Sequence, residues 1–157
     1  MTRMTLVQPD SLELWAEARR LVEEYVASLG LDLGFQDFRH EIGSLAGEYG
    51  APDGCFILAE LAGTFVGCGG LRRFSGSTCE MKRLYVVPAS RRGGAGRTIA
   101  EALIEQARHL GYQTMLLDTL PSMSRAQELY ASLGFKPTAA YRYNPVPGTS
   151  FLRLELR

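Results

Sequence analysis

Residues 78–99, TCEMKRLYVVPASRRGGAGRTI, join three kinds of local pattern in one short stretch. The run before Pro88 is rich in apolar, aromatic and β-branched residues, which is typical of a strand, and the proline ends it. Arginines and glycines follow, and from Gly94 onward apolar residues recur at helical spacing: Ile99, Leu103, Ala107 and Leu110. The stretch therefore predicts a strand that leads through a glycine-rich turn into an amphipathic helix, which ends at Gly111.

The glycine-rich turn predicts a binding site for an anion. Amides in the first turn of a helix have no intrahelical partner, and the helix dipole adds partial positive charge there. The glycines allow a ligand to approach the backbone, and Arg91, Arg92 and Arg97 add charge. Two phosphate-binding motifs do not fit. A dinucleotide-binding turn needs glycine where Ile99 stands, and the phosphate loop of nucleotide hydrolases needs glycine where Arg91 stands. A solvated basic loop is the alternative interpretation.

The patterns on either side of this stretch predict further strands and helices. Upstream they indicate a strand, two helices and a hairpin of two strands: residues 3–8, 10–30, about 35–48, 55–60 and 64–71. Downstream they indicate a buried strand, a helix and two more strands: residues 113–118, 124–134, 135–143 and 149–156. The expected order is β-α-α-β-β-β-α-β-α-β-β, an α/β (α+β) fold forming a single domain over residues 1–157.

Composition indicates an ordinary globular chain of 157 residues, 46% hydrophobic and 22% charged. No apolar run approaches the roughly 18–20 residues of a membrane span, and the charged N-terminal stretch does not fit a signal peptide, so we expect a cytoplasmic protein. The formal net charge of zero argues against nucleic acid or an anionic membrane as the partner. Cys55, Cys68 and Cys79 match no zinc spacing, so we expect buried free thiols and no metal.

Charge is divided unevenly along the chain. Residues 1–50 carry four basic and nine acidic side chains, whereas residues 51–157 carry thirteen and eight. Such a division suits a protein that holds a cationic reactant against one part and an anionic reactant against another. Solvated acidic helix faces would give the same counts.

Two motifs resemble those of a known enzyme family. RRGGAG at residues 91–96, after a strand and a proline, resembles the acyl-CoA site of the GNAT superfamily of N-acetyltransferases, whose signature is Gln/Arg-x-x-Gly-x-Gly/Ala. AQELYASLGF at residues 126–135 looks like the second signature of that family. The order of elements is also similar, and the resemblance is firmest over residues 78–136. It implies a mixed, mostly antiparallel, twisted sheet of about seven strands flanked by four helices.

The resemblance implies acetyl-CoA as the co-substrate and assigns binding roles. Backbone amides from Arg92 to Gly96 would hold the pyrophosphate. The strand before Pro88 would diverge from its parallel neighbour, residues 113–118, and its free backbone would pair with the pantetheine arm. The implied CoA-binding residues are Leu84, Val86, Arg91, Arg92, Gly93, Gly94, Ala95, Gly96, Arg97, Thr98 and Ser124.

The same resemblance points to two catalytic residues. It places Tyr130 beside the thioester sulfur as the general acid, and an unperturbed phenol pKa near 10 suits that role. A core tyrosine is the alternative. A backbone N–H near Val86 would polarise the thioester carbonyl. Glu80 is the candidate base on the preceding strand, but strand alternation groups it with Lys82, Leu84 and Val86, which leaves open that this end of the strand faces solvent.

One position departs from the family pattern. The second signature often begins with asparagine three residues before its alanine, and Met123 stands there. A hydrogen bond to the pantetheine or to Tyr130 would then be lost or taken over by Ser124. However, Ser124 and Gln127 also fit a capping box, in which the serine hydroxyl is occupied at the start of the helix.

The resemblance places the amine acceptor against the first two helices and the loop near the end of the chain. Acidic and aromatic residues there suit a small-molecule or peptide amine: Tyr25, Asp32, Phe35, Asp37, Tyr141 and Tyr143. We expect direct transfer in a ternary complex, because no cysteine or serine lies in a nucleophile motif. An acyl-CoA-binding module without turnover is the alternative, and residues 135–141 and 150–156 are candidates for strand pairing in a homodimer.

Overall fold

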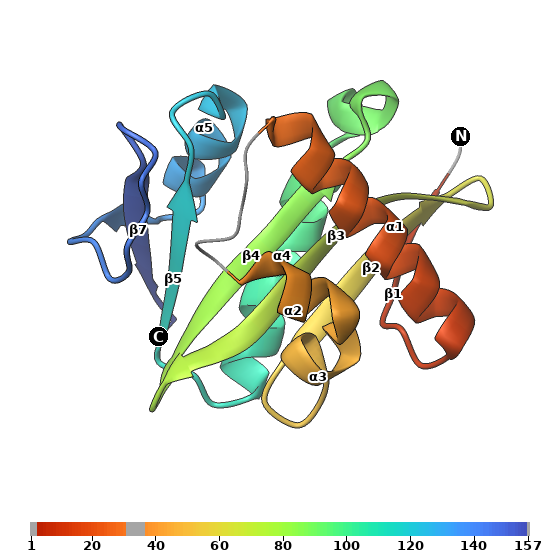
Figure 1. The fold of residues 1–157 in the computed structure, drawn as a ribbon, viewed down its shortest axis with the longest axis horizontal. Helices are drawn as coiled ribbons and strands as arrows, with labels where there is room; N and C mark the ends of the chain where they lie inside the picture. The colour runs from red at the N-terminus through yellow and green to blue at the C-terminus, as the bar shows by residue number, and fades with distance from the viewer. Residues whose placement is uncertain (1–2, 31–36, 157) are drawn as a thin grey trace.

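A computed structural model describes residues 3–30 and 37–156 (Figure 1). Within these residues seven strands form one sheet in the order β1-β2-β3-β4-β5-β7-β6. Their bounds are β1 (Met4–Val7), β2 (Cys55–Leu61), β3 (Thr64–Ser75), β4 (Thr78–Val86), β5 (Thr114–Thr119), β6 (Lys136–Pro137) and β7 (Ser150–Glu155). Only the β4–β5 pair is parallel, and the other pairs are antiparallel. The predicted mixed, mostly antiparallel sheet is confirmed.

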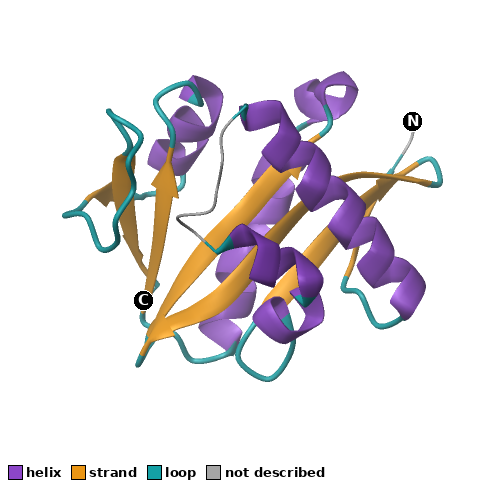
Figure 2. Cartoon of the chain, in the orientation of Figure 1, coloured by secondary structure: helices purple, strands orange, loops and turns teal. Residues whose placement is uncertain are grey.

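Helices cover both faces of the sheet (Figures 1 and 2). One face carries α1 (Leu12–Leu29), α2 (Phe38–Gly43) and α3 (Leu45–Tyr49); the opposite face carries α4 (Ala95–His109), and α5 (Ser124–Ser132) lies beyond the end of β5. Strand alternation supplies both cores, since Phe56 and Leu58 pack with α1 and α3 while Cys55 and Ile57 pack with α4. None of the helices in the described residues is long and apolar enough to cross a membrane.

The boundaries of α1 follow from its capping residues. Ser11 Oγ accepts a hydrogen bond from the Leu14 amide at 3.2 Å, which satisfies one of the free donors of the first turn. Gly30 ends the helix with φ +64°, in the left-handed region that glycine adopts without strain. Both positions lie at the ends of the helix predicted over residues 10–30.

A β-bulge in β4 changes which side chains share a face. Cys68 of β3 pairs with Tyr85 and Gly70 pairs with Lys82, so two residues of β4 lie opposite one residue of β3. Arg83 takes up the extra length with φ +61°. The predicted alternation that grouped Glu80 and Lys82 with Leu84 and Val86 is therefore wrong. Leu84 and Val86 pack on the α4 side, whereas Tyr85 packs on the α1 side.

Two predicted helix boundaries need correction. The single helix expected over about 35–48 is two short helices that meet at Ser44, whose φ of −152° and ψ of 59° interrupt the helical backbone; residues 35 and 36 lie outside the described residues. The capping box at the start of α5 is also wrong. Met123 is the residue before the helix, no side chain caps it, and Gln127 Nε2 donates to the Leu120 carbonyl instead.

The strand expected over residues 135–143 is much shorter. β6 contains only Lys136 and Pro137, and one further backbone bond joins the Thr138 amide to Phe151. Beyond that point the chain leaves the sheet because side chains of this segment turn inward toward β4, where Tyr141 and Arg142 contact a buried carboxylate. Tertiary contacts therefore override a strand-like local pattern.

Candidate functional site

The sheet opens between β4 and β5. Their parallel pairing runs from Thr78 and Thr114 to Glu80 and Leu116 and then stops, although β4 continues to Val86 and β5 to Thr119. Paired strands lie about 4.8 Å apart, and Figure 1 shows these two diverging beyond the paired part. The predicted divergence is confirmed, and it leaves backbone and side chains of both strands facing a gap.

The larger of two cavities at this gap is a cleft of about 620 Å³ between the end of β4, the start of α4 and α5. Its lining comes from four parts of the chain: Tyr25, Ser28, Leu29, Leu84, Tyr85, Val86, Arg91, Gly94, Gly96, Arg97, Ser122, Met123, Ser124, Arg125, Ala126 and Leu129. Seven of the residues expected to bind CoA are among them. The cleft therefore brings together the strand end, the glycine turn and the second motif.

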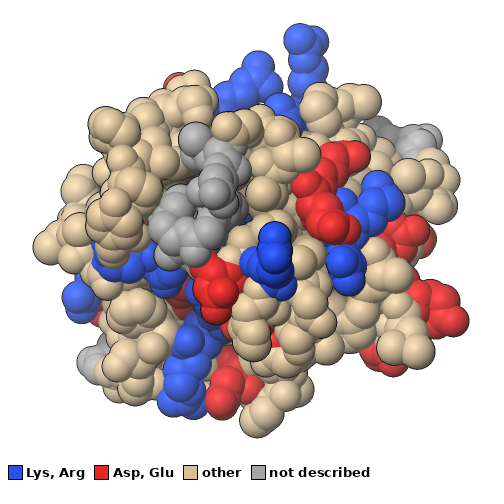
Figure 3. Space-filling view, in the orientation of Figure 1, with Lys and Arg blue, Asp and Glu red and all other residues tan. Residues whose placement is uncertain are grey.

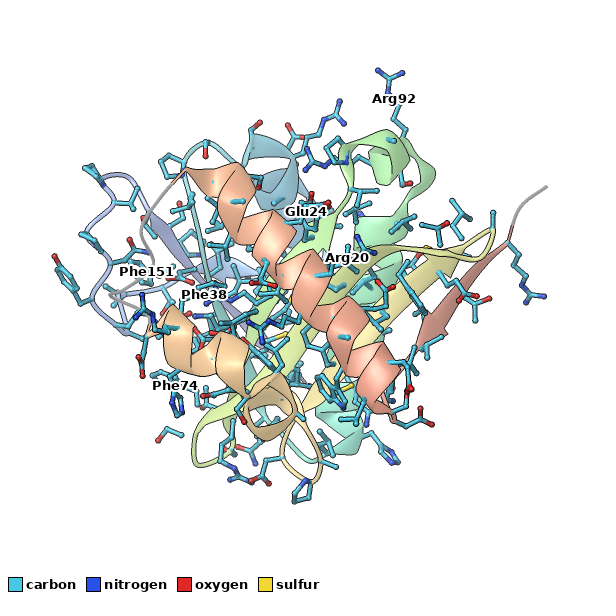
Figure 4. All side chains as sticks on the ribbon, turned by 45° about the vertical axis from the view of Figure 1, so that its right-hand side comes forward. Arg20, Glu24, Phe38, Phe74, Arg92 and Phe151 are labelled. Carbon is cyan, nitrogen blue, oxygen red and sulfur yellow. The ribbon has the colours of Figure 1, made fainter. Side chains whose placement is uncertain are left out.

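Four expected binding residues do not line this cleft. Arg92 extends away from the body of the protein (Figure 4), and Gly93 lies beside it in a short 3₁₀ helix, Pro88–Gly93. Ala95 is buried in the core below the turn. Thr98 Oγ1 donates to the Gly94 carbonyl at 3.0 Å. For Thr98 and Ala95, the side chains have structural roles, so any contribution to ligand binding comes from their backbone.

The turn itself presents free backbone donors. Gly94 has φ +78° and directly precedes α4, and a Cβ added at Gly93 or Gly94 would meet no atom within 4 Å. The amides at the start of a helix have no intrahelical acceptor, and the positive end of the helix dipole lies behind them. This donor set fits a phosphate or pyrophosphate group, as in acetyl-CoA.

Two of the arginines near the turn, Arg91 and Arg97, are held in place by hydrogen bonds to the protein. Arg91 Nε donates to the Val86 carbonyl at 2.8 Å, and its guanidinium lies over the Tyr85 ring at 5.8 Å. Arg97 Nη2 donates to Ser132 Oγ. Arg91 therefore fixes the end of β4 and leaves its charge at the mouth of the cleft.

The smaller cavity, about 60 Å³, lies between the diverging strands. It is lined by Tyr25, Leu29, Met81, Lys82, Arg83, Leu84, Leu117, Asp118, Thr119, Leu120, Met123, Ala126, Tyr130 and Asn144. Tyr130 is 7% exposed and packs edge-on against Phe135. Burial raises the pKa of its phenol, and the nearby Tyr25 and Asp118 raise it further. Tyr130 thus stays protonated across the physiological range.

Met123 fills the position where the family pattern has asparagine. Its sulfur accepts weak hydrogen bonds from the Tyr25 hydroxyl and from Thr119 Oγ1, each at 3.9 Å. Burial raises the pKa of Tyr25 to about 12. Ser124 lines the cleft, and no side chain caps α5, so the serine hydroxyl is not occupied in the predicted capping box.

Glu80 is buried in a network of its own. Its side chain is fully buried and accepts from Arg142 Nη2 at 2.6 Å, from the Tyr141 hydroxyl at 2.8 Å and from Arg72 Nη2 at 3.5 Å. The alternative that this end of the strand faces solvent is wrong, because Lys82 is also only 5% exposed. Glu80 lines neither cavity.

A second buried ion pair supports the bulge. The Arg83 guanidinium donates through Nε and Nη2 to the Glu41 carboxylate, each at 2.8 Å. The Tyr49 hydroxyl donates to the same carboxylate at 2.8 Å. These hydrogen bonds, with the charge of Arg83, lower the pKa of Glu41 despite its burial. The pair holds α2 against β4 beside the smaller cavity.

Sequence reasoning missed three charged residues of the smaller cavity, Lys82, Arg83 and Asp118. Burial and the charge of Arg83 lower the pKa of Lys82 to about 8, against an opposing effect of Glu80. Asp118 accepts a hydrogen bond from Asn144 Nδ2 at 3.2 Å. A carboxylate that ends a buried apolar strand was the available signal for Asp118; nothing local marked Lys82.

The acceptor residues expected from the sequence are scattered. Tyr25 lines both cavities, but Tyr141 bonds to Glu80 and Tyr143 is 73% exposed. Asp37 precedes α2 and lines neither cavity. Asp32 and Phe35 lie outside the described residues. On the face that α1 covers, the described acidic and basic side chains are interspersed (Figure 3).

The cysteines are free and buried, as predicted. Burial raises the pKa of Cys55 to about 11 and that of Cys79 to about 12, and it raises the pKa of Cys68 as well. Because the thiolate is the reactive form, none of the three is activated as a nucleophile. Within residues 3–30 and 37–156, no cluster of three or more His, Cys, Asp or Glu side chains is arranged to hold a metal ion.

Comparison with known proteins gives a consistent result. The sequence profile described as Acetyltransferase (GNAT) family matches residues 15–135. An uncharacterized N-acetyltransferase of Schizosaccharomyces pombe is 41% identical over 140 residues, which cover 88% of this chain and 86% of that protein.

Two solved structures share the fold. An acetyltransferase of the GNAT family from Staphylococcus aureus has a TM-score of 0.80 at 17% identity, covering 99% of this chain and 100% of its own. A putative acetyltransferase from Salmonella typhimurium, solved with its cofactor acetyl-CoA, has a TM-score of 0.68 at 24% identity, covering 98% and 94%.

Proposed function

This chain belongs to the acetyltransferase (GNAT) family, and we propose that it transfers an acetyl group from acetyl-CoA to a primary amine within one ternary complex. The observation that carries the proposal is the junction of the two cavities. Five residues line both: Tyr25, Leu29, Leu84, Met123 and Ala126. A ligand held at the start of α4 would therefore extend along β4 toward Tyr130, where the second reactant enters.

The cleft would hold acetyl-CoA, which supplies the acetyl thioester. The amides from Gly94 to Arg97 and the charges of Arg91 and Arg97 suit its pyrophosphate. The backbone of Leu84 and Val86 beyond the last β4–β5 pair suits its pantetheine arm, although the Val86 carbonyl is already bonded to Arg91. Ser124 stands across the cleft from this strand.

Tyr130 would act as the general acid. The amine nitrogen forms a bond to the acetyl carbon while the carbon–sulfur bond breaks, and the Tyr130 hydroxyl gives its proton to the departing sulfur. The nitrogen loses one proton in becoming an amide, and that proton restores the phenol. A raised pKa keeps the proton on Tyr130 until the sulfur leaves, which is the state that an acid requires.

Glu80 was the expected base, and we now propose a positioning role for it. Its oxygens are occupied by Arg142, Tyr141 and Arg72, and it contacts neither cavity. Through Tyr141 and Arg142 it fixes the segment that brings Asn144 to the wall of the smaller cavity. Glu80 would thereby shape the acceptor site from outside it.

The test is release of free thiol from acetyl-CoA over a panel of primary amines, with Tyr130→Phe alongside. We expect turnover in the wild type and a loss of kcat on the order of 10²–10⁴-fold in the variant, as for removal of a general acid. Calorimetry should show that the variant still binds CoA. Binding of acetyl-CoA with no thiol release from any amine would instead support the alternative, an acyl-CoA-binding module.

The oligomeric state is a separate proposal. β7 pairs with β5 along its whole length, and β6 covers only Leu152 and Arg153 on its other side. A homodimer formed through this end of the sheet remains a prediction. Light scattering after gel filtration would test it.

A further inference from the structure

The Tyr25 side chain reaches the junction of the two cavities from α1. The C-terminal end of this helix lies near the start of α5 (Figure 1), where the Tyr25 hydroxyl contacts the sulfur of Met123. Tyr25 and Met123 both line the cleft and the smaller cavity. The hydroxyl therefore lies beside the passage that a ligand would follow from one cavity into the other.

This hydroxyl is a proton donor with a weak partner. Within residues 3–30 and 37–156, its one hydrogen-bond acceptor is the Met123 sulfur at 3.9 Å. A thioether is a weak acceptor, and an ordinary O–H···O hydrogen bond measures about 2.7–2.8 Å. Burial raises the pKa of Tyr25 to about 12, so the phenol keeps its proton at neutral pH. An oxygen atom of a ligand at the junction would be a better acceptor than the sulfur.

The thioester of a bound acetyl-CoA would lie beside this hydroxyl. The start of α4, which would hold the pyrophosphate, opens into the cleft, whereas Tyr130 lines the smaller cavity and not the cleft. For Tyr130 to protonate the departing sulfur, the thioester has to lie where the two cavities meet. Tyr25 also raises the pKa of Tyr130, which burial raises most, so the two phenols are within electrostatic range of each other.

We propose that the Tyr25 hydroxyl donates a hydrogen bond to the carbonyl oxygen of the acetyl thioester and stabilises the negative charge that forms there. This inference rests on the proposed acetyl transfer and adds a catalytic residue to it. When the amine nitrogen bonds to the acetyl carbon, one electron pair of the C=O bond moves to the oxygen. The double bond then re-forms as the sulfur leaves with the proton of Tyr130. Tyr25 keeps its proton throughout, so the two phenols have different tasks.

The first test is the rate of thiol release by Tyr25→Phe with an amine that the wild type uses. The substitution keeps the ring, which packs against Tyr85 at 5.5 Å between ring centres. We expect kcat to fall by about 10²–10³-fold, as for removal of one oxyanion donor, with a much smaller change in KM for acetyl-CoA. Calorimetry without amine checks that the variant binds acetyl-CoA, and thermal unfolding checks its folding.

Tyr112→Phe is the matched control. Tyr112 is also a buried tyrosine, its hydroxyl donates to the Asp53 carbonyl at 2.6 Å, and it lines neither cavity. This variant loses a stronger hydrogen bond than Tyr25→Phe does, so it shows what loss of a buried phenol hydroxyl costs in stability alone. We expect it to keep the kcat of the wild type.

A second comparison separates catalysis from a structural role through Met123. If Tyr25 served only to hold the Met123 sulfur, Tyr25→Phe would have no further effect once Met123→Leu has removed that sulfur. A hydrogen bond to the thioester predicts instead that Tyr25→Phe lowers kcat by a similar factor in both backgrounds. Loss of the effect in the Met123→Leu background would overturn the inference.

Infrared spectroscopy tests the hydrogen bond without turnover. The probe is acetyl-CoA that is isotopically labelled at the carbonyl carbon and bound in the absence of amine. A hydrogen bond to the carbonyl oxygen lowers its stretching frequency, so the frequency should be lower in the wild type and in Tyr112→Phe than in Tyr25→Phe.

An equal carbonyl frequency in the wild type and Tyr25→Phe would overturn the inference, and so would an unchanged kcat; both results leave acetyl transfer itself intact. Absence of thiol release by the wild type with every amine would refute the proposed function. The infrared comparison would then still decide whether Tyr25 bonds to the thioester.

Discussion

Replacing Glu80 by glutamine tests whether this carboxylate is a base or a positioning residue. Glutamine keeps the shape of the side chain but removes the charge that Arg142 and Arg72 share. Arg72 retains a second partner in Glu48 at 3.2 Å. Among the described residues, the Arg142 guanidinium otherwise contacts the rings of Tyr141 and Phe74, and its Nε is buried without a hydrogen-bond partner there. The cost therefore falls on Arg142.

The size of the effect follows from the burial of Glu80. Removing one partner of a buried ion pair costs about 3–5 kcal/mol, and glutamine, which still accepts a hydrogen bond, should lie near the lower end. The double variant Glu80→Gln/Arg142→Met removes both charges and should recover most of the loss. Glu105→Gln is the surface control, because the Glu105 side chain is 76% exposed, and it should change the free energy of unfolding by less than about 0.5 kcal/mol.

Urea unfolding and the pH profile of kcat/KM read out the two roles separately. As a positioning residue, Glu80 should affect stability and KM for the amine, and the acidic limb of the profile should persist in the variant. A base would show the opposite result: kcat lower by about 10²–10⁴-fold, loss of the acidic limb and an unchanged free energy of unfolding. That outcome would refute the positioning role.

Three further predictions concern stability. Glu41→Gln should cost roughly 3 kcal/mol in urea unfolding, because it leaves a buried guanidinium uncompensated; a cost as small as that of the exposed Glu105→Gln would contradict this. Lys82 has a pKa lowered to about 8, so its burial penalty is full below that pH and disappears toward the unfolded pKa of 10.5. The free energy of unfolding of the wild type relative to Lys82→Met should therefore rise by roughly 3 kcal/mol between pH 7.5 and 10.5. A difference that stays constant over this range would show that burial does not destabilise the charged form of Lys82. Gly70→Ala should cost about 1–3 kcal/mol, since a Cβ there would lie 2.8 Å from the Tyr49 ring; thermal unfolding at the wild-type temperature would disprove this steric argument.

Much of the fold was readable from short-range patterns. Local patterns located α1 within residues 10–30, where Ser11 and Gly30 cap it, and the glycine-rich turn at residues 91–96 located the start of α4. These signals are local because hydrogen bonds within one turn involve residues three or four positions apart. Local patterns predicted the wrong structure over residues 35–48 and 135–143, because contacts with distant parts of the chain decide the backbone path there.

The same distinction between local and distant contacts applies to the candidate site. The sequence by itself determined the glycine-rich turn, the strand before it and the position of Tyr130, because these depend on neighbouring residues and a family motif. Only the tertiary structure decided the bulge at Arg83, the burial of Glu80 among Arg142, Arg72 and Tyr141, and the placement of Lys82 opposite Asp118. Each of those features joins residues that are far apart in the chain, and their charges and burial exist only once β4 and β5 have paired and then diverged.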